Sequence, residues 1–242
     1  SSRGVKSSNN SGDMHYWGVW WGGEPFSAYE KEVPRFMSEY GFQSFPEFKA
    51  IKKFTKPEDH DMYSTVMQSH QRSSIGNKTI EKYLLYHYKK PKDFESLLYV
   101  SQLMQAYGIG LGAEAHRKNR ARCMGSLYWQ LNDCWPVASW SSIDYYGNWK
   151  ALHYTIKKVF APVIVTHSIE QDTLHTYVVS DLLDTLYAQI NYELLAFNGK
   201  RLTTKSKQIT IVPNQSNKHL SVAMNQLLAS NEKDNVFLKT EL

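Results

Sequence analysis

The sequence predicts a chain of two parts, a mixed α/β part followed by an all-β part, and three observations carry this prediction. Residues 55–120 show the three- and four-residue apolar spacing of helices. Short strand-like runs at 35–40 and 122–129 flank that helical stretch. In the last third of the chain, β-branched runs recur about every ten residues with turns between them, which is typical of a β-sandwich. We therefore expect one domain over residues 1–160 and a second over residues 161–242.

The composition is that of a globular protein with enough apolar residues for real cores. Its 242 residues are 42% hydrophobic, and no apolar run reaches the length that spans a bilayer, so we expect no membrane contact. The net charge of +5 arises from 28 basic and 23 acidic residues spread along the chain. No base-stacking motif accompanies them, so we expect no nucleic-acid partner. Seven Trp and an aromatic content of 14% supply flat faces on which sugar rings can stack.

The first organised stretch, residues 12–23, places four Trp or Tyr rings, a histidine and an aspartate between glycines. Such a segment is poor helix material, and the glycines indicate a loop that backbone or ligand approaches closely. In one interpretation this loop caps a hydrophobic core. In the other it forms one wall of a sugar site, in which Asp13 and His15 exchange hydrogen bonds with hydroxyl groups.

The next stretch, residues 35–46, sets a single carboxylate, Glu39, among aromatic and apolar neighbours. Phe36 and Met37 lead in as a strand, and Gly41 indicates that the chain turns away soon afterwards. Glu39 would then lie at the carboxyl end of a strand, where barrel enzymes place catalytic groups. The alternative is a structural acid paired with a nearby Arg or Lys.

The helical stretch resolves into three predicted helices. Thr55 is the expected N-cap of the first, with a proline and a glutamate in its first turn, and this helix should run to about Arg72. The others cover residues 79–89 and 93–119. Glycines at 108–112 predict either a kink in the last helix or a close helix contact. The histidines are spaced too irregularly for a zinc site on one face.

After these helices the pattern returns to a strand at residues 122–133, whose far end turns polar. A buried strand with a polar carboxyl end is typical of a barrel strand that leads into a site. Residues 149–160 then predict a helix that closes the first domain. In the second domain, the pair Asn198-Gly199 is a strong signal for a hairpin turn.

Three of these segments resemble one enzyme family. Ser-Glu-Tyr-Gly-Phe-Gln-Ser-Phe-Pro, from Ser38 to Pro46, resembles the nucleophile strand of the retaining β-glycosidases of glycoside hydrolase family 2, and most closely their β-mannosidase branch. The Gly-Asp-x-His-x-Trp pattern that ends at Trp17 resembles the loop before that strand. Trp-Gln-Leu-Asn-Asp-Cys-Trp-Pro, which begins at Trp129, resembles the last strand of the family's barrel.

The resemblance implies a fold, an activity and a site. The fold would be the carboxyl-terminal part of a (β/α)8 TIM barrel followed by an immunoglobulin-like β-sandwich. The activity would be hydrolysis of terminal β-mannosides in oligosaccharides or glycoconjugates, without a metal or organic cofactor. Glu39 would be the nucleophile and Trp129 the floor of the sugar pocket. Three further side chains would contact sugar hydroxyls: His15, Trp17 and Asn132.

One part of the family pattern is missing from this sequence. The acid/base glutamate follows an asparagine in the family, and no Asn-Glu pair in a strand context precedes Glu39. We therefore expect the acid/base group to lie in amino-terminal domains of the same polypeptide, and the 242 residues alone to be inactive. Two alternatives stay open: another family 2 exo-β-glycosidase, acting on galactosides, glucuronides or glucosaminides, and a non-catalytic carbohydrate-binding module.

Overall fold

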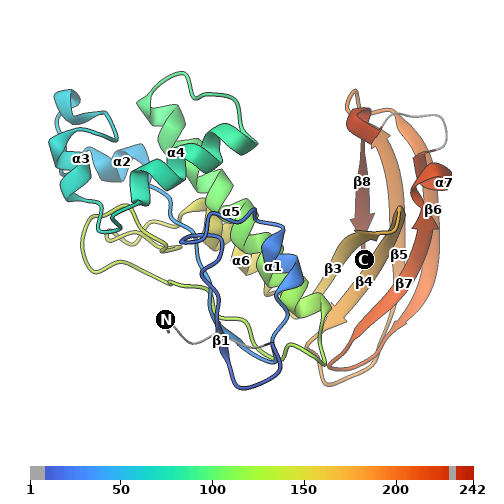
Figure 1. Ribbon diagram of the computed structural model, residues 1–242. Coiled ribbons are helices and arrows are strands. Elements are labelled where there is room, and N and C mark those ends of the chain that lie inside the picture. The colour runs from blue at the N-terminus through green and yellow to red at the C-terminus, as the bar shows by residue number, and fades with distance from the viewer. Residues whose placement is uncertain (1–8, 229–232) are drawn as a thin grey trace. The chain divides into compact units, whose positions relative to one another are not determined.

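The computed structural model describes residues 9–228 and 233–242 (Figure 1). They divide into two compact units. The first consists of the described residues up to His116 together with Arg122–Val159, and the second consists of Arg117–Ala121 and Phe160–Leu242. None of the helices in these described residues is long and apolar enough to cross a membrane.

The first unit is built on three parallel chain segments. Strands β1 (Met14–His15) and β2 (Met37–Glu39) pair in parallel. On the other side of β2, residues 124–129 run parallel to it through a bridge between Met37 and Ser126. Met37 N donates to the Gly125 carbonyl at 2.9 Å, and Leu127 N donates to the Met37 carbonyl at 2.8 Å. The strand that carries Glu39 is therefore the middle one of the three.

Residues 122–133 were predicted as a buried strand, and the structure corrects this in part. The segment forms two isolated bridges, one from Ser126 to Met37 and one from Asn132 to Ile143, instead of a regular strand. The side chains of Met124 and Leu127 are 55% and 54% exposed. The alternation of residues in a sequence shows which side chains share a face of the segment. It does not show whether other parts of the chain cover that face, so the exposure could not be predicted.

The helices surround these segments. Their bounds are as follows: α1 (Ala28–Lys31), α2 (Phe48–Ile51), the 3-10 helix η1 (Pro57–Asp59), α3 (Thr65–Ser69), α4 (Gly76–His87), α5 (Phe94–Lys118) and α6 (Ala151–Val159). Figure 1 shows α5 as the longest of them.

The single helix predicted from Thr55 to Arg72 was wrong. Thr55 is not an N-cap, because its hydroxyl donates back to the Ile51 carbonyl at 2.8 Å behind α2. The chain then makes η1, a turn and the short α3, which Ser64 caps by accepting from Met67 N at 3.2 Å. The Asp61 carboxylate accepts from the backbone N of Tyr63 at 2.6 Å. Such a side-chain hydrogen bond favours a turn over a continuing helix.

The glycines of α5 produce close contacts rather than a break, since the helix is continuous over its 25 residues. A Cβ added at Gly108 would lie 2.4 Å from the ring of Phe26, and one at Gly112 would lie 3.0 Å from the ring of Tyr40. Aromatic rings therefore fill the space that side chains would otherwise occupy. Met104, on the same helix, is fully buried in the core of this unit.

Lys150 is a fully buried lysine beside this core. Its Nζ donates to the carbonyls of Ser44 at 3.3 Å and Ser139 at 3.1 Å. Burial lowers the pKa of Lys150 to about 7, opposed by the charges of Asp133 and Asp144. Both carbonyls also accept backbone hydrogen bonds from each other's residues. The ammonium group is therefore not needed to satisfy them.

This burial predicts a pH-dependent stability that Lys150→Met removes. Between pH 7 and the ordinary value of 10.5, the unfolded chain binds a proton that the folded chain does not. The contribution of Lys150 to the free energy of unfolding of the parent protein therefore rises with pH across that interval. Below the interval this contribution is at its lowest. We expect Lys150→Met to gain stability over the parent protein at about pH 6 and to lose that advantage toward about pH 10.

Denaturant titrations followed by Trp fluorescence test this, because all seven Trp lie in the first unit. Lys158→Met, at an exposed position of α6, is the matched control and should show the same difference at both pH values. A stability difference for Lys150→Met that does not change with pH would contradict the prediction.

The second unit is a β-sandwich of two three-stranded sheets (Figure 1). One sheet has the order β3 (Val163–Glu170), β4 (Thr173–Ser180), β7 (Ser216–Ala223), and the other has the order β6 (Arg201–Ile211), β5 (Leu186–Ala196), β8 (Val236–Glu241). Helices α7 (Met224–Leu228) and η2 (Lys233–Asn235) lie between β7 and β8 in the chain.

The core of this unit lies between the sheets and includes Val178, Ile190 and Ile211. The predicted hairpin is confirmed: Ala196 N donates to the Lys200 carbonyl at 2.9 Å, and Gly199 has a φ of +85°. The sequence did not indicate β7, whose residues are mostly polar and half-buried at a sheet edge.

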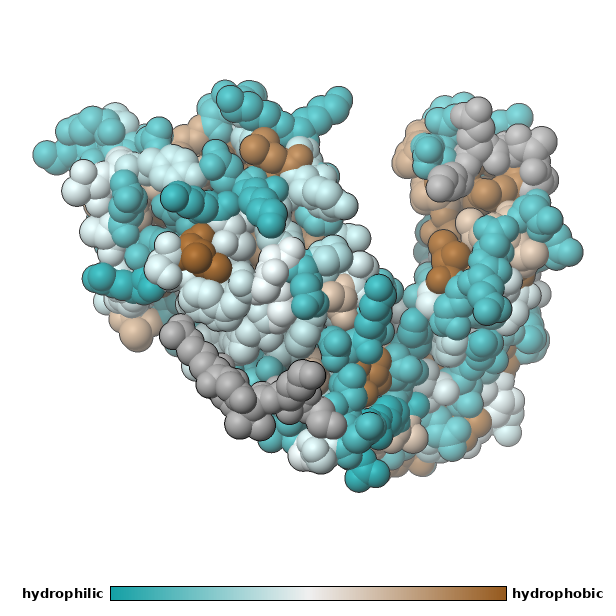
Figure 2. Space-filling model, viewed as in Figure 1, coloured by the Kyte–Doolittle hydropathy of each residue, from teal (hydrophilic) through white to brown (hydrophobic). Residues whose placement is uncertain are grey.

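On the face drawn in Figure 2, hydrophobic residues form separate patches within a largely hydrophilic or neutral surface.

Candidate active site

The Glu39 carboxylate lies at the end of β2 with two side chains from the β1 region against it. Trp17 Nε1 donates to Glu39 Oε2 at 3.1 Å, and His15 Nδ1 lies 3.3 Å from the same oxygen. The Glu39 side chain is 23% exposed, so it is accessible without being on the open surface. The structure thus brings together three of the residues singled out from the sequence. The apolar neighbours Met37 and Tyr40 are buried, whereas polar groups surround the carboxylate itself.

Asp13 contacts the far side of the His15 ring and so joins the group formed by Glu39, His15 and Trp17. Its Oδ2 lies 3.5 Å from His15 Nε2 and accepts a hydrogen bond from the Ser38 hydroxyl. That hydroxyl holds the pKa of Asp13 below its ordinary value, and His15 contributes in the same direction. Asp13 is exposed and remains an ionised acceptor at neutral pH. Parallel pairing explains the arrangement, because it sets the ends of β1 and β2 side by side.

Trp129 approaches from the opposite side of β2. Its backbone N donates to the Tyr40 carbonyl at 2.8 Å, one residue beyond Glu39, and its side chain is 43% exposed. On the β1 side, Tyr16 N donates to the Glu39 carbonyl at 2.8 Å. The backbone at Glu39 and Tyr40 therefore lies between the His15–Trp17 segment and the segment that carries Trp129.

Gly41 makes this convergence possible. A Cβ at this position would lie 2.4 Å from the Trp129 carbonyl oxygen, 3.1 Å from the Trp140 ring and 3.2 Å from the Trp17 ring. Three tryptophans from three parts of the chain therefore meet around one residue that has no side chain. Because the nearest atom is backbone, no side-chain rotation can make room for a larger residue.

Trp140 supports the site through its ring contacts. It packs edge-on against Trp17 at 6.1 Å and against Trp20 at 5.5 Å between ring centroids. The antiparallel bridge between Ser44 and Ser139 brings its loop back to the strand that carries Glu39. No local pattern signals such a bridge, since it joins residues far apart in the sequence.

Behind Glu39, buried polar groups support the strand. The Ser126 hydroxyl donates to the Tyr40 hydroxyl at 3.0 Å, and His116 Nδ1 lies 2.8 Å from the same Ser126 oxygen. Burial raises the pKa of Tyr40 and lowers the pKa of His116 to about 4, so both stay neutral around pH 7. This group holds the strand without taking part in charge changes.

Asn132 is not brought to Glu39 by any contact in the described part of the chain. It is exposed, its carbonyl accepts from Gln130 Nε2 at 3.0 Å, and its backbone bridges to Ile143. Trp135 lies further along the same loop, with the Arg72 guanidinium 5.0 Å above its ring.

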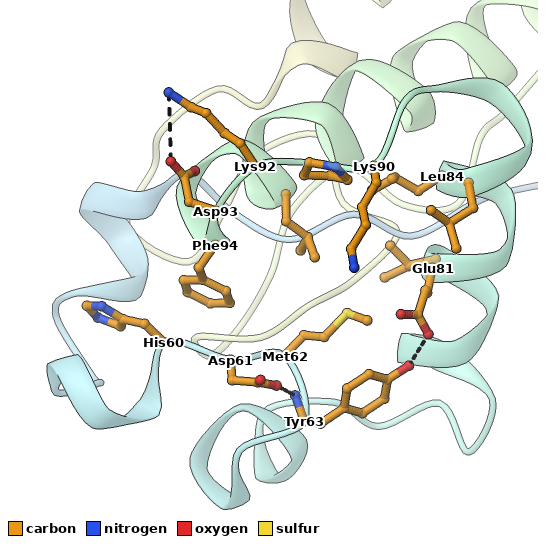
Figure 3. Close-up of a pocket in the computed structure, with 14 residues that line it drawn as sticks. His60, Asp61, Met62, Tyr63, Glu81, Leu84, Lys90, Lys92, Asp93 and Phe94 are labelled. Atoms are coloured by element: carbon orange, nitrogen blue, oxygen red, sulfur yellow. Dashed lines mark hydrogen bonds and ion pairs between the residues drawn. The ribbon is translucent and has the colours of Figure 1, made fainter.

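A separate cavity of about 370 Å³ lies among the helices that follow β2 (Figure 3). Tyr63 and Glu81 lie on one side of it, where the Tyr63 hydroxyl donates to Glu81 Oε2 at 2.5 Å. Burial and this hydrogen bond raise the pKa of Tyr63 to about 12. Lys92 pairs with Asp93 at 3.8 Å at its rim. The cavity contains none of the residues singled out from the sequence, and these charged groups already have partners.

Among the residues that the structure describes, no group of three or more His, Cys, Asp or Glu side chains is arranged to hold a metal ion. The site around Glu39 therefore offers a carboxylate, an imidazole, hydrogen-bond donors and aromatic faces. Such a set can bind a polyhydroxylated ligand and attack an electrophilic carbon.

Comparison with known proteins places these observations in a family context. Residues 172–242 match the family model of the Mannosidase Ig/CBM-like domain. The β-mannosidase of Capra hircus is 36% identical over 189 residues, which cover 72% of this chain and 21% of that protein. β-Mannosidase B of Aspergillus niger is 30% identical over 231 residues, covering 87% of this chain and 27% of that protein. The chain spans about a fifth to a quarter of the length of the curated relatives it matches.

Solved structures agree with these matches. The crystal structure of β-D-mannosidase from Dictyoglomus thermophilum has a TM-score of 0.89 and 35% identity, covering 95% of this chain and 28% of that one. The exo-chitosanase of Amycolatopsis orientalis has a TM-score of 0.73 at 16% identity, over 90% of this chain and 27% of that one, a likeness in fold alone. The predicted fold class is confirmed: part of a (β/α)8 barrel precedes an immunoglobulin-like sandwich.

Proposed function

The chain belongs to the β-mannosidases of glycoside hydrolase family 2, and from this premise we propose that the full polypeptide removes terminal β-mannosyl residues with Glu39 as its nucleophile. One observation carries the proposal. The Glu39 carboxylate ends the middle strand, with Oε2 held by Trp17 and approached by His15, and the exposed Trp129 ring lies on the next segment.

The proposed reaction is a double displacement that retains the configuration at the anomeric carbon. A Glu39 oxygen forms a bond to that carbon while the bond to the aglycone oxygen breaks, and the departing electron pair takes a proton from a carboxylic acid. Water then bonds to the same carbon. The ester electron pair returns to Glu39, and the proton of the water passes to the carboxylate that acted first as the acid.

The acid/base carboxylate is the group that this chain does not supply in our proposal. No second carboxylate contacts Glu39 among the residues that the structure describes. Asp13 is separated from the Glu39 carboxylate by the His15 ring, and its lowered pKa suits an acceptor rather than an acid. We propose that another part of the same polypeptide brings this group, and that the 242 residues alone lack turnover.

The substrate class follows from the walls of the site. In our proposal the Trp129 face carries the terminal mannose of an oligosaccharide or glycoconjugate, Trp17 lines the pocket, and Asn132 reaches a hydroxyl from the loop. Stacking of a sugar on an indole uses the C–H groups of one ring face, and the hydroxyl contacts then select the sugar. The chemistry needs neither a metal nor an organic cofactor.

A panel of aryl β-glycosides tests the substrate on the full polypeptide. We expect the mannoside to react about 10²-fold faster than the galactoside, glucuronide or glucosaminide, because hydroxyl-specific hydrogen bonds discriminate strongly. A 2-deoxy-2-fluoro mannoside with a good leaving group should then trap a covalent ester, which peptide mapping locates. Preference for another glycoside would replace the substrate assignment, and a label on another residue would remove Glu39 as nucleophile.

A further inference from the structure

The two oxygens of the Glu39 carboxylate have unequal surroundings. Oε2 accepts from Trp17 Nε1 at 3.1 Å and lies 3.3 Å from His15 Nδ1. The indole N–H can only donate, so the direction of the first contact is fixed. Trp17 is itself held by the Trp140 ring. Among the described residues, no hydrogen bond or ion pair involves Oε1.

His15 lies between two carboxylates and uses both ring nitrogens. Nδ1 faces Glu39 Oε2, and Nε2 faces Asp13 Oδ2 at 3.5 Å. Both ring nitrogens are therefore turned toward carboxylate oxygens. The ring then has no nitrogen left for a sugar hydroxyl, which is the role that the sequence suggested.

Asp13 is fixed in turn by the strand that carries Glu39. The Ser38 hydroxyl, one residue before Glu39, donates to Asp13 Oδ2 and lies 3.2 Å from the Met14 carbonyl. The contacts therefore form a closed path from Ser38 through Asp13 and His15 back to Glu39. A closed path restrains both strand ends and the ring between them.

We propose that His15 is a positioning residue that acts with Trp17 to hold Oε2 of Glu39, oriented by Asp13, so that Oε1 is the oxygen that attacks the anomeric carbon. This inference rests on the proposed function. In the step, an Oε1 lone pair forms the bond to carbon as the bond to the leaving oxygen breaks. With an activated aryl mannoside, the electron pair departs on the phenolate and no acid is required.

The test uses the full polypeptide and measures trapping by an activated 2-deoxy-2-fluoro mannoside, giving a rate constant and a KI for each variant. His15→Ala should slow trapping at least about tenfold, the value of one hydrogen bond to a charged group. Its KI should stay within about threefold, because in this proposal the ring does not touch the sugar. His15→Gln keeps a donor and should recover most of the rate.

Asp13→Asn tests the closed path. It should slow trapping less than His15→Ala does, and the double variant should be no slower than His15→Ala alone, because Asp13 acts through the ring. His175→Gln is the matched control. That half-buried histidine of the second unit contacts Ser221 and should trap at the parental rate.

The outcomes separate this inference from the function on which it rests. A label on a residue other than Glu39 would remove the proposed function. A label on Glu39 with unchanged trapping in folded His15→Ala and His15→Gln would overturn only the inference. A higher KI with an unchanged rate constant would also overturn it, because that result makes His15 a sugar contact.

Discussion

Glu39→Gln in the full polypeptide is expected to lower turnover of an aryl β-mannoside by about 10⁴- to 10⁶-fold, the loss typical of removing the nucleophile from a catalytic unit. The amide has nearly the shape of the carboxylate, but it cannot form the ester. Trp17 Nε1 would still meet an oxygen acceptor, so the fold around β2 should persist. Steady-state kinetics, with a melting curve to confirm folding, give the result.

Glu47→Gln is the matched control for this experiment. Glu47 is exposed, lies eight positions further along the same segment and has Lys49 as an ion-pair partner at 4.0 Å. The control should keep full activity. If folded Glu39→Gln kept a tenth of the parental rate, the carboxylate of Glu39 could not be the attacking group.

Gly41→Ala should be the second most damaging change, although it adds a single methyl group. The new Cβ would lie 2.4 Å from the Trp129 carbonyl oxygen, so the Trp129 segment must move away from β2. Overpacking of this kind costs about 1–3 kcal/mol of stability. A displacement of the Trp129 ring by about 1 Å would lower kcat/KM by about 10²-fold.

Gly199→Ala is the control that separates a loss of stability from a loss of activity. Its φ of +85° makes the substitution strained, but it lies at the hairpin of the second unit, where a Cβ would meet no atom within 4 Å. It should lower stability by about 1 kcal/mol and leave kcat/KM unchanged. An active Gly41→Ala variant with parental stability would show that the three tryptophans do not depend on this position.

The part of the site that could be predicted comes from short-range pattern. Polar groups of the loop at residues 12–23 could be expected to face a sugar site that also contains Glu39, whereas the parallel pairing of β1 with β2, which sets His15 beside Glu39, was not predicted. The convergence of donors on Glu39 follows from this geometry. It could be expected from the residue types before any coordinates were known.

The parts that could not be predicted depend on tertiary contacts. Trp140 reaches the site through a bridge between Ser44 and Ser139, and nothing in its own neighbourhood in the sequence indicates that pairing. The helix expected after Thr55 was lost to hydrogen bonds of the Asp61 turn, which compete with the helix over a few residues. Strand β7 lacks the apolar alternation by which the other sandwich strands were found.

The close fit between Gly112 of α5 and the ring of Tyr40 has an evolutionary consequence. A Cβ at 112 would lie 3.0 Å from the Tyr40 ring and 3.2 Å from Tyr29, so a side chain there requires these two residues to shift or to be replaced by smaller ones. Tyr40 is next to Glu39 in the chain. A mutation at position 112 of α5 can therefore shift the backbone beside the proposed nucleophile. Across homologues we therefore expect a side chain at position 112 to accompany a change at position 40 or 29. Lineages that reshape the pocket should acquire the helix substitution and the ring substitution together.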